Sequence, residues 1–324
     1  MRQTALVALA MLLTGCAVHG TAPPSIPSGP ISPQFAGSHV LSPFPSAAAP
    51  LASRGWMSKE ATSGAKLLYV SSYPACGGCV LIFEQKTGAL VGLLSAGPLI
   101  KPQGLATDSS GNLYVTNENP DQNAVWIYPP GSIFPSNNLY DPGAPSNVVV
   151  GDDGTIYVSN SGPTAAIMVY SNGSTNPTSE MFDVSAAQGY GIAVDKRGNV
   201  YWGISTVSGF QIDKFKHGTV LPVNLGIILN DTPQSMAFDS DNRLVVSQPD
   251  IPSINIYKLP NTLVKQLGQT GAPVGIAFKG PHGLFVADRN TNQIEQYAYP
   301  AGNVLQTFAP PNFNPIGVAV YPQP

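Results

Sequence analysis

Residues 273–294 read PVGIAFKGPHGLFVADRNTNQI, and the fold class follows from this pattern. A proline precedes a short apolar run, a tight turn containing glycine follows, and a second apolar run ends at Asp288. Apolar runs of this length, separated by turn residues, are typical of antiparallel β-strands joined by a hairpin. A third run ends at the aromatic residue Tyr297. The stretch therefore predicts a small antiparallel sheet.

The same pattern recurs along the chain at intervals of 43, 44, 44, 40 and 42 residues. The residues that start the first runs are Gly104, Asn147, Gly191, Ser235, Gly275 and Gly317. A proline stands two residues before five of these six positions, and Gly189 stands before the other. The repeats show no helical period over about twelve residues. Four strands in a repeat of ~40 residues are typical of one blade of a β-propeller.

The two ends of the repeat region complement each other. Residues 67–70 (LLYV) have the pattern of a second strand with no first strand before it, and residues 317–320 (GVAV) that of a first strand with nothing after it. Pairing them completes one blade and leaves no exposed sheet edge at the seam. We therefore predict an all-β, six-bladed β-propeller of four-stranded blades, closed by the C-terminal strand joining the first blade.

The repeat unit resembles the NHL repeat. The best match lies in the sixth blade, where Pro273-Val-Gly-Ile-Ala-Phe278 is followed by Gly283-Leu-Phe-Val-Ala-Asp288 and Asn292-Gln-Ile294. The resemblance covers roughly residues 66–321. It implies the fold and a structural role for Asp288, but no function, because this scaffold carries hydrolases, lyases and binding modules alike.

Residues 1–15 have the features of a bacterial lipoprotein signal peptide. Arg2 precedes an apolar run of about ten residues, too short to span the ~30 Å of a bilayer core as a helix. The run ends in Leu13-Thr14-Gly15-Cys16, which resembles the lipobox, whose cysteine carries diacylglycerol after cleavage. Ala17 follows, which by resemblance to proteobacterial sorting favours the outer membrane. We expect a cell-envelope protein, lipid-anchored at Cys16, that faces the periplasm or the cell surface.

Residues 16–58 are expected to form a Pro/Ser/Ala-rich tether, and residues 59–324 the propeller. From Cys16 to Ser53 the sequence has no Asp, Glu, Lys or Arg and no periodic apolar face to bury. The chain has a formal net charge of −3 and no basic run, so nucleic acid is not an expected partner. The expected partners are the membrane, through the lipid, and an unidentified protein, glycan or neutral small molecule.

One residue just before each first run is expected to ring a mouth of the central channel. These residues are Gln103, Ser146, Tyr190, Gln234, Val274 and Ile316. None is charged, so the ring lacks the carboxylates and imidazoles that a divalent cation takes as ligands. Its polar members fall on one arc and its two aliphatic members on the other, as in many small-molecule sites. We predict contacts to a neutral ligand such as a sugar, with Tyr190 stacking on its ring; the alternative is that these residues only pack the channel.

Several other candidate residues favour structural roles. Cys76-Gly-Gly-Cys79 has neither the following histidine of a haem site nor the second cysteine pair of a zinc site, so we predict a Cys76–Cys79 disulfide. The two histidines of the repeats, His217 and His282, are expected on the surface. Polar residues in the loops between second and third strands either cap turns or bind a ligand, and we favour capping. They are Asn117, Glu118, Asn119, Asp121, Asn160, Asp250, Asp288, Arg289 and Asn290.

The sequence shows no nucleophile elbow, phosphate loop or metal-ligand set. We therefore assign no cofactor, no metal and no catalytic residue, and favour a lipoprotein that presents its propeller as a binding or interaction scaffold. The alternative is a propeller enzyme of the lactonase or lyase type that acts at the central channel. About one equivalent of tightly held Ca²⁺ or Zn²⁺ in the purified protein would favour the enzyme.

Overall fold

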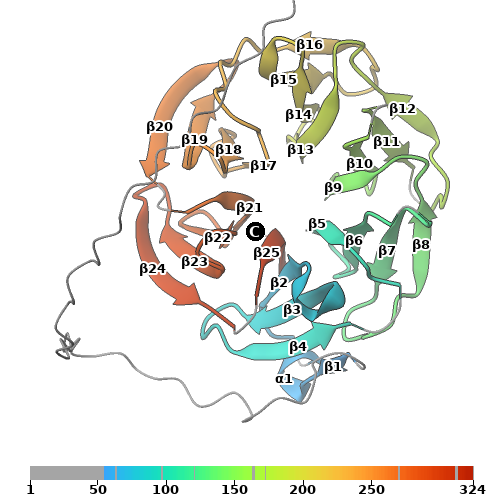
Figure 1. Cartoon of the computed structure of the whole chain (residues 1–324), viewed down its shortest axis with the longest axis vertical. Helices are drawn as coiled ribbons and strands as arrows, with labels where there is room; N and C mark the ends of the chain where they lie inside the picture. The colour runs from blue at the N-terminus through green and yellow to red at the C-terminus, as the bar shows by residue number, and fades with distance from the viewer. Residues whose placement is uncertain are drawn as a thin grey trace, which may run out of the picture. The chain divides into compact units, whose positions relative to one another are not determined.

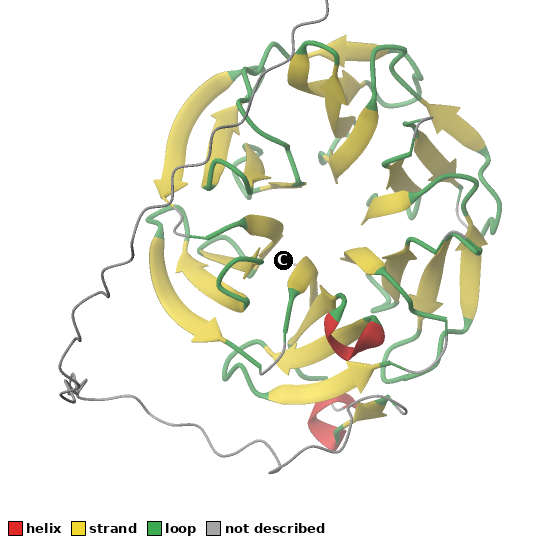
Figure 2. Cartoon of the chain, viewed as in Figure 1, coloured by secondary structure: helices red, strands yellow, loops and turns green. Residues whose placement is uncertain are grey.

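A computed structural model describes residues 55–323, apart from 63, 96–97, 120, 163–164, 172, 269–270 and 311–312. Cys16, the predicted signal peptide and most of the predicted tether lie outside these residues. Strands dominate, and the helical segments are α1 (Lys59–Thr62) and the 3-10 turn η1 (Ala75–Gly77) (Figure 2). Within the described part of the chain, no helix is long and apolar enough to cross a membrane.

Six antiparallel sheets surround a central axis, so the domain is a six-bladed β-propeller, as predicted (Figure 1). The first strands, nearest the axis, are β25 (Pro315–Tyr321), β5 (Pro102–Thr107), β9 (Pro145–Val150), β13 (Gln188–Val194), β17 (Ser235–Phe238) and β21 (Pro273–Phe278). The second strands are β2 (Leu67–Ser72), β6 (Leu113–Asn117), β10 (Ile156–Asn160), β14 (Val200–Thr206), β18 (Leu244–Gln248) and β22 (Gly283–Asp288). The third strands are β3 (Cys79–Glu84), β7 (Ala124–Tyr128), β11 (Ile167–Tyr170), β15 (Gly209–Phe215), β19 (Ser253–Lys258) and β23 (Gln293–Ala298). The outer strands are β4 (Leu90–Leu94), β8 (Asn137–Tyr140), β12 (Ser179–Met181), β16 (Pro222–Asn224), β20 (Thr262–Gly268) and β24 (Asn303–Phe308).

The first blade is completed by the C-terminal strand, which confirms the predicted closure. β25 pairs antiparallel with β2, with Leu68 opposite Val320 and Val70 opposite Val318. These four side chains are buried in one apolar cluster with residues of the neighbouring sixth blade. The same blade gains a fifth strand that the sequence did not predict, because β1 (Trp56–Met57) pairs with the outer edge of β4.

In several blades, a carboxylate organises the turn between the first and second strands. In the fourth blade, Asp195 Oδ1 accepts hydrogen bonds from the backbone N–H groups of Arg197 and Asn199, at 2.9 and 3.0 Å. Its Oδ2 accepts from Asn199 Nδ2 and from the Tyr201 hydroxyl, at 2.8 and 3.0 Å. Partial burial opposes ionisation, but these hydrogen bonds outweigh it and lower the pKa of Asp195. The recurring Asp-x-x-Gly-Asn turn is therefore a structural device of the repeat.

The aromatic residue that ends each third strand packs inside the ring. The sequence marked this position, and the side chains there are buried: Tyr128, Tyr170, Phe215, Tyr257 and Tyr297. Each lies in an apolar cluster that joins two adjacent blades. Burial of aromatic side chains between sheets, at roughly 1.5–3 kcal/mol each, is what holds neighbouring blades together.

Candidate functional site

A channel of about 500 Å³ runs along the axis, between the first strands. Five of the six residues predicted at its mouth line it: Gln103, Ser146, Gln234, Val274 and Ile316. They lie at one end of the channel, because the first strands start there in every blade and each of these residues is within one residue of such a start. Whether they contact a ligand stays a prediction.

Tyr190 is placed elsewhere and is not among the residues that line the channel. In β13, Gly189 pairs with Ile204 but Ile192 pairs with Trp202, so the register shifts around Tyr190. Its ring packs edge-on against Phe210 of β15, with 6.4 Å between ring centroids, and its hydroxyl donates to Gln188 Oε1 at 2.6 Å. The expected convergence of six side chains is therefore reduced to five, and the proposed stacking of Tyr190 on a channel ligand is withdrawn.

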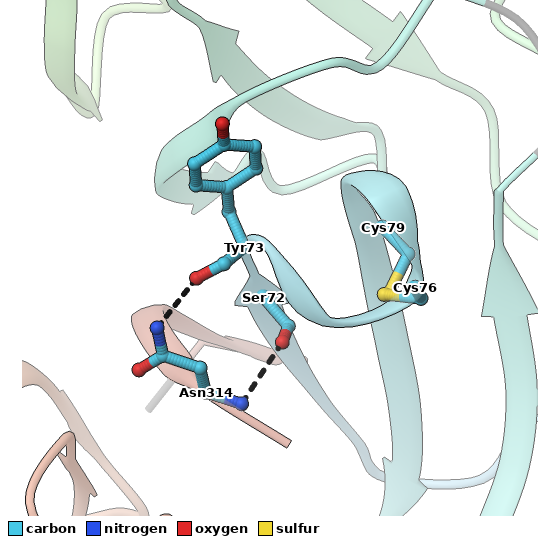
Figure 3. Close-up of a disulfide and its surroundings, with 5 residues drawn as sticks. All are labelled: Ser72, Tyr73, Cys76, Cys79 and Asn314. Carbon is cyan, nitrogen blue, oxygen red and sulfur yellow. Dashed lines mark hydrogen bonds between the residues drawn. A yellow bond between two sulfur atoms is a disulfide. The ribbon is translucent and has the colours of Figure 1, made fainter. Parts of the chain in front are cut away.

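A smaller hollow of about 250 Å³ lies at the same mouth, and we call it the mouth hollow. Four channel residues line it together with five residues from the surrounding loops: Gln103, Gln234, Val274, Ile316, Tyr73, Pro74, Lys101, Arg289 and Asn314. Asn314 Nδ2 donates to the Tyr73 carbonyl oxygen at 2.6 Å, and the Asn314 N–H donates to Ser72 Oγ at 3.2 Å (Figure 3). These two bonds tie the wall of the mouth hollow to the first blade.

Four of these residues, Tyr73, Pro74, Lys101 and Asn314, were not predicted from the sequence, although the repeat contains a signal for three of them. Lys101 and Asn314 occupy equivalent positions, each directly before the proline of a first strand. Tyr73 is equivalent to Arg289, since each directly follows a second strand. If the repeats are compared at the position before the proline and at the position after the second strand, Lys101, Asn314, Tyr73 and Arg289 are all predicted to lie at the mouth.

The first strands approach one another closely at this end, and the recurring glycine permits it. A Cβ atom on Gly317 would lie 2.2 Å from the carbonyl oxygen of Gln103, and one on Gly275 would lie 2.4 Å from that of Ile316. Side chains never come so close to backbone atoms, so no larger residue fits at these two positions without a shift of the strands. The glycine of the repeat therefore sets the width of the channel.

The polar residues that end the second strands hold the mouth loops. Asn117 Oδ1 accepts hydrogen bonds from the N–H groups of Ile100 and Lys101, at 2.8 and 3.0 Å. Asp288 Oδ1 accepts from the N–H groups of Ala272, Asn290 and Thr291, each at 3.0 Å. Both side chains are fully buried. These contacts support the capping interpretation, and they fix the backbone from which Lys101 and Arg289 project.

Cys76 and Cys79 are joined by a disulfide at the tip of the first blade (Figure 3). Gly78, between them, has a φ of +97°, and a Cβ there would lie 2.3 Å from the carbonyl oxygen of Ile100. Glycine is therefore required where this turn meets the loop that leads to Lys101. His217 and His282 are exposed, and no group of three or more His, Cys, Asp or Glu suited to a metal ion occurs in the part of the chain that is described.

A carboxyl pair lies in the fourth blade, away from the channel lining. Asp213 of β15 is fully buried, and Gln211 Nε2 donates to its Oδ1 at 2.9 Å. Burial, together with the hydrogen bond and the negative charge of Asp183, raises the pKa of Asp213 to about 7. The same contact helps to lower the pKa of Asp183 against its partial burial. Below neutral pH, Asp213 is therefore the protonated member of the pair.

Comparison with known proteins supports the fold and goes no further. No protein-family model matches the chain, and no curated protein matches it in sequence. A chain of the nidogen/laminin complex has 19% identity and a TM-score of 0.65, over 79% of this chain and 98% of that chain. A protein of unknown function from Bacteroides caccae has 16% identity and a TM-score of 0.63, over 80% and 100%. A streptogramin B lyase has 18% identity and a TM-score of 0.53, over 67% and 72%.

Proposed function

We propose that the protein is a cell-envelope lipoprotein whose NHL-like propeller binds a small hydroxylated ligand at the mouth hollow. The lipid on Cys16, the tether and the location at the outer membrane are proposed from the sequence of the first 58 residues. In this arrangement the propeller is a binding scaffold held at a membrane surface, open to the periplasm or to the cell exterior.

The observation that carries the proposal is the chemistry of the mouth hollow. The amide groups of Gln103 and Gln234 each offer donors and an acceptor to a ligand hydroxyl. The Tyr73 ring, Val274 and Ile316 supply aromatic and aliphatic surface beside them. A concave site with a few polar groups against an apolar wall is typical of small-molecule binding, and the ring of a sugar presents both kinds of surface.

A screen of mono- and oligosaccharides by thermal shift, followed by calorimetry on the purified protein, tests this proposal. We expect Gln103→Ala combined with Gln234→Ala to weaken binding of any sugar found at least tenfold, because two hydrogen-bonding amides are lost. Gln266→Ala, at an exposed glutamine of β20, is the matched control and should bind like the wild type. Unchanged binding by the double variant would place the ligand elsewhere on the protein.

The alternative function is that of a lactonase- or lyase-like enzyme acting at the same channel. Such an enzyme would need metal ligands or an acid–base pair at the mouth, and the charged residues that line the mouth hollow are Lys101 and Arg289. Metal analysis of the purified protein separates the two proposals. About one equivalent of retained Ca²⁺ or Zn²⁺ would favour the enzyme over the binding scaffold.

A further inference from the structure

The mouth hollow carries positive charge, although none of the six residues predicted at the channel mouth is charged. Two cationic side chains line it, Lys101 and Arg289, and no carboxylate of the described residues lines it with them. Lys101 Nζ lies 2.7 Å from Glu118 Oε2, so its charge is paired. Arg289 is exposed and forms no ion pair with any residue that the structure describes. The mouth hollow therefore presents one uncompensated cation to a ligand.

Arg289 projects from a backbone that is fixed in place. Its N–H donates to the carbonyl oxygen of Ala272 at 3.0 Å, which ties the turn to the start of the sixth blade. The neighbouring Asp288 is fully buried, and its Oδ1 accepts hydrogen bonds from the N–H groups of Ala272 and Asn290. Asp288 is therefore directed into the turn, while the guanidinium of Arg289 stays at the mouth. A guanidinium binds a carboxylate through two parallel N–H···O bonds, and a fixed base lowers the entropic cost of that contact.

A second group in the mouth hollow lacks a partner. Asn314 uses its Nδ2 to donate to the Tyr73 carbonyl oxygen, but its Oδ1 is buried and has no hydrogen-bond donor among the described groups. The mouth hollow thus offers a site for a carboxylate at Arg289, while the amides of Gln103 on the second blade and Gln234 on the fifth offer hydrogen bonds to hydroxyl groups.

We infer that the ligand of the mouth hollow is a small hydroxylated carboxylic acid of the uronic acid type, with its carboxylate bound by Arg289. This inference rests on the proposed function and names the ligand class for the same site. The volume of about 250 Å³ matches a single sugar ring, since it falls below the ~300–1,000 Å³ of sites for drug-sized ligands. Charge complementarity then selects the acid over the neutral sugar.

Calorimetry on the purified protein with galacturonate and galactose tests the inference, because the two sugars differ only in the carboxylate at one carbon. We expect galacturonate to bind at least tenfold more tightly than galactose, and the difference to shrink as added salt screens the charge. Arg289→Gln should reduce galacturonate binding at least tenfold and leave galactose binding unchanged. Arg289→Lys should lie between the two, because it keeps the charge but loses the planar fork.

Arg197→Gln is the matched control, since Arg197 is also an exposed arginine in a turn, at the opposite end of the first strands. It should bind both sugars like the wild type. Equal affinity for galacturonate and galactose would overturn the inference and leave the proposed function standing, whereas binding of neither sugar would count against both. Inorganic phosphate is a third probe. Phosphate that competes as strongly as galacturonate would show a general anion site and would also overturn the inference.

Discussion

The hydroxyl of Ser71 donates a hydrogen bond to the carbonyl oxygen of Gln103, and so joins the first blade to the second at the mouth of the channel. The Ser71 Oγ in turn accepts a hydrogen bond from the N–H of Gly317 at 2.7 Å, so this hydroxyl links three strands. Ser71 and Gly317 are buried, whereas Gln103 is half-buried. This contact therefore holds Gln103 in place as well as closing the seam of the ring.

Ser71→Ala should destabilise the domain by about 1–3 kcal/mol, because it leaves the buried N–H of Gly317 without an acceptor. Urea unfolding followed by tryptophan fluorescence measures the change. Ser110→Ala, at an exposed turn position in the second blade, is the control and should unfold at the wild-type midpoint. A Ser71→Ala midpoint equal to that of the control would mean that this hydroxyl contributes nothing to the seam.

Removal of β25, by ending the chain at Asn314, should abolish cooperative unfolding. The truncation exposes one whole edge of β2 and removes Val318 and Val320 from the core, at roughly 1.5–3 kcal/mol for each buried side chain. A domain is stable by only about 5–15 kcal/mol. Ending the chain at Tyr321 instead keeps β25 and is the control. A melting temperature shared by both truncations would refute closure by this strand.

Asp213 should contribute a loss of stability to the domain as pH rises from about 4 to about 7. Its pKa is raised from 3.8 to about 7 in the folded protein, so in this interval the folded state binds more protons than the unfolded state. The loss in the free energy of unfolding is absent below the pKa of Asp213 in the unfolded chain and complete above its pKa in the folded protein. It amounts to at most about 4 kcal/mol, at ~1.4 kcal/mol per pKa unit. Asp213→Asn removes the titrating group and should flatten the profile.

Urea unfolding at pH 4.5 and pH 8 measures this difference. Asp213→Asn should be more stable than the wild type at pH 8 and close to it at pH 4.5. The exposed Asp121→Asn, which removes an equal charge, should follow the wild-type profile. If Asp213→Asn keeps the wild-type dependence on pH, some other group is responsible for it.

The Cys76–Cys79 disulfide should form in protein exported to an oxidising compartment. Mass spectrometry without reductant should find the peptide that contains both cysteines lighter by two hydrogens. Because the closed loop is very short, the entropic stabilisation is small, and Cys76→Ser with Cys79→Ser should shift the melting temperature only slightly. Free thiols in periplasmic material would contradict the prediction.

Cys16 should carry the lipid in the bacterial cell. Labelling with a palmitate analogue is expected to tag the wild type and to leave Cys16→Ser untagged. The double serine variant at positions 76 and 79 serves as the control, because it removes the other cysteines of the chain and should still be labelled. Equal labelling of wild type and Cys16→Ser would rule out this anchor.

The sequence predicts the ring well because each blade repeats the same local pattern. Proline, glycine and the aromatic end of the third strand recur at fixed positions, and β25 pairs with β2 as the unpaired pattern at each end requires. The directions of the side chains at the mouth are harder to predict from the sequence. Tyr190 has the right position in the repeat, and the register shift beside it recurs in four other first strands, but its ring packs against Phe210 of β15. That contact depends on Phe210, which is outside the repeated pattern of the first strand.

The loops around the mouth differ from blade to blade, so the repeat period predicts them less well than it predicts the strands. Lys101, Tyr73 and Asn314 reach the mouth hollow from segments whose length and composition differ between blades. Hydrogen bonds within a blade hold them there: the Lys101 N–H donates to Asn117 Oδ1 in the second blade, and Asn314 Nδ2 donates to the Tyr73 carbonyl oxygen in the first. The repeat gives the positions of these residues, but not the side-chain contacts that direct them to the mouth.

Closure by the C-terminal strand also sets the order in which the domain can fold. β2 is made early and its partner β25 is the last strand of the propeller to be synthesised, roughly 10–50 s later at ~5–20 residues per second. Until then the first blade has an open edge and an unfilled core, so the ring stays incomplete while the ribosome is still at work. The ring can therefore close only after synthesis of β25, so closure follows translation and does not accompany it.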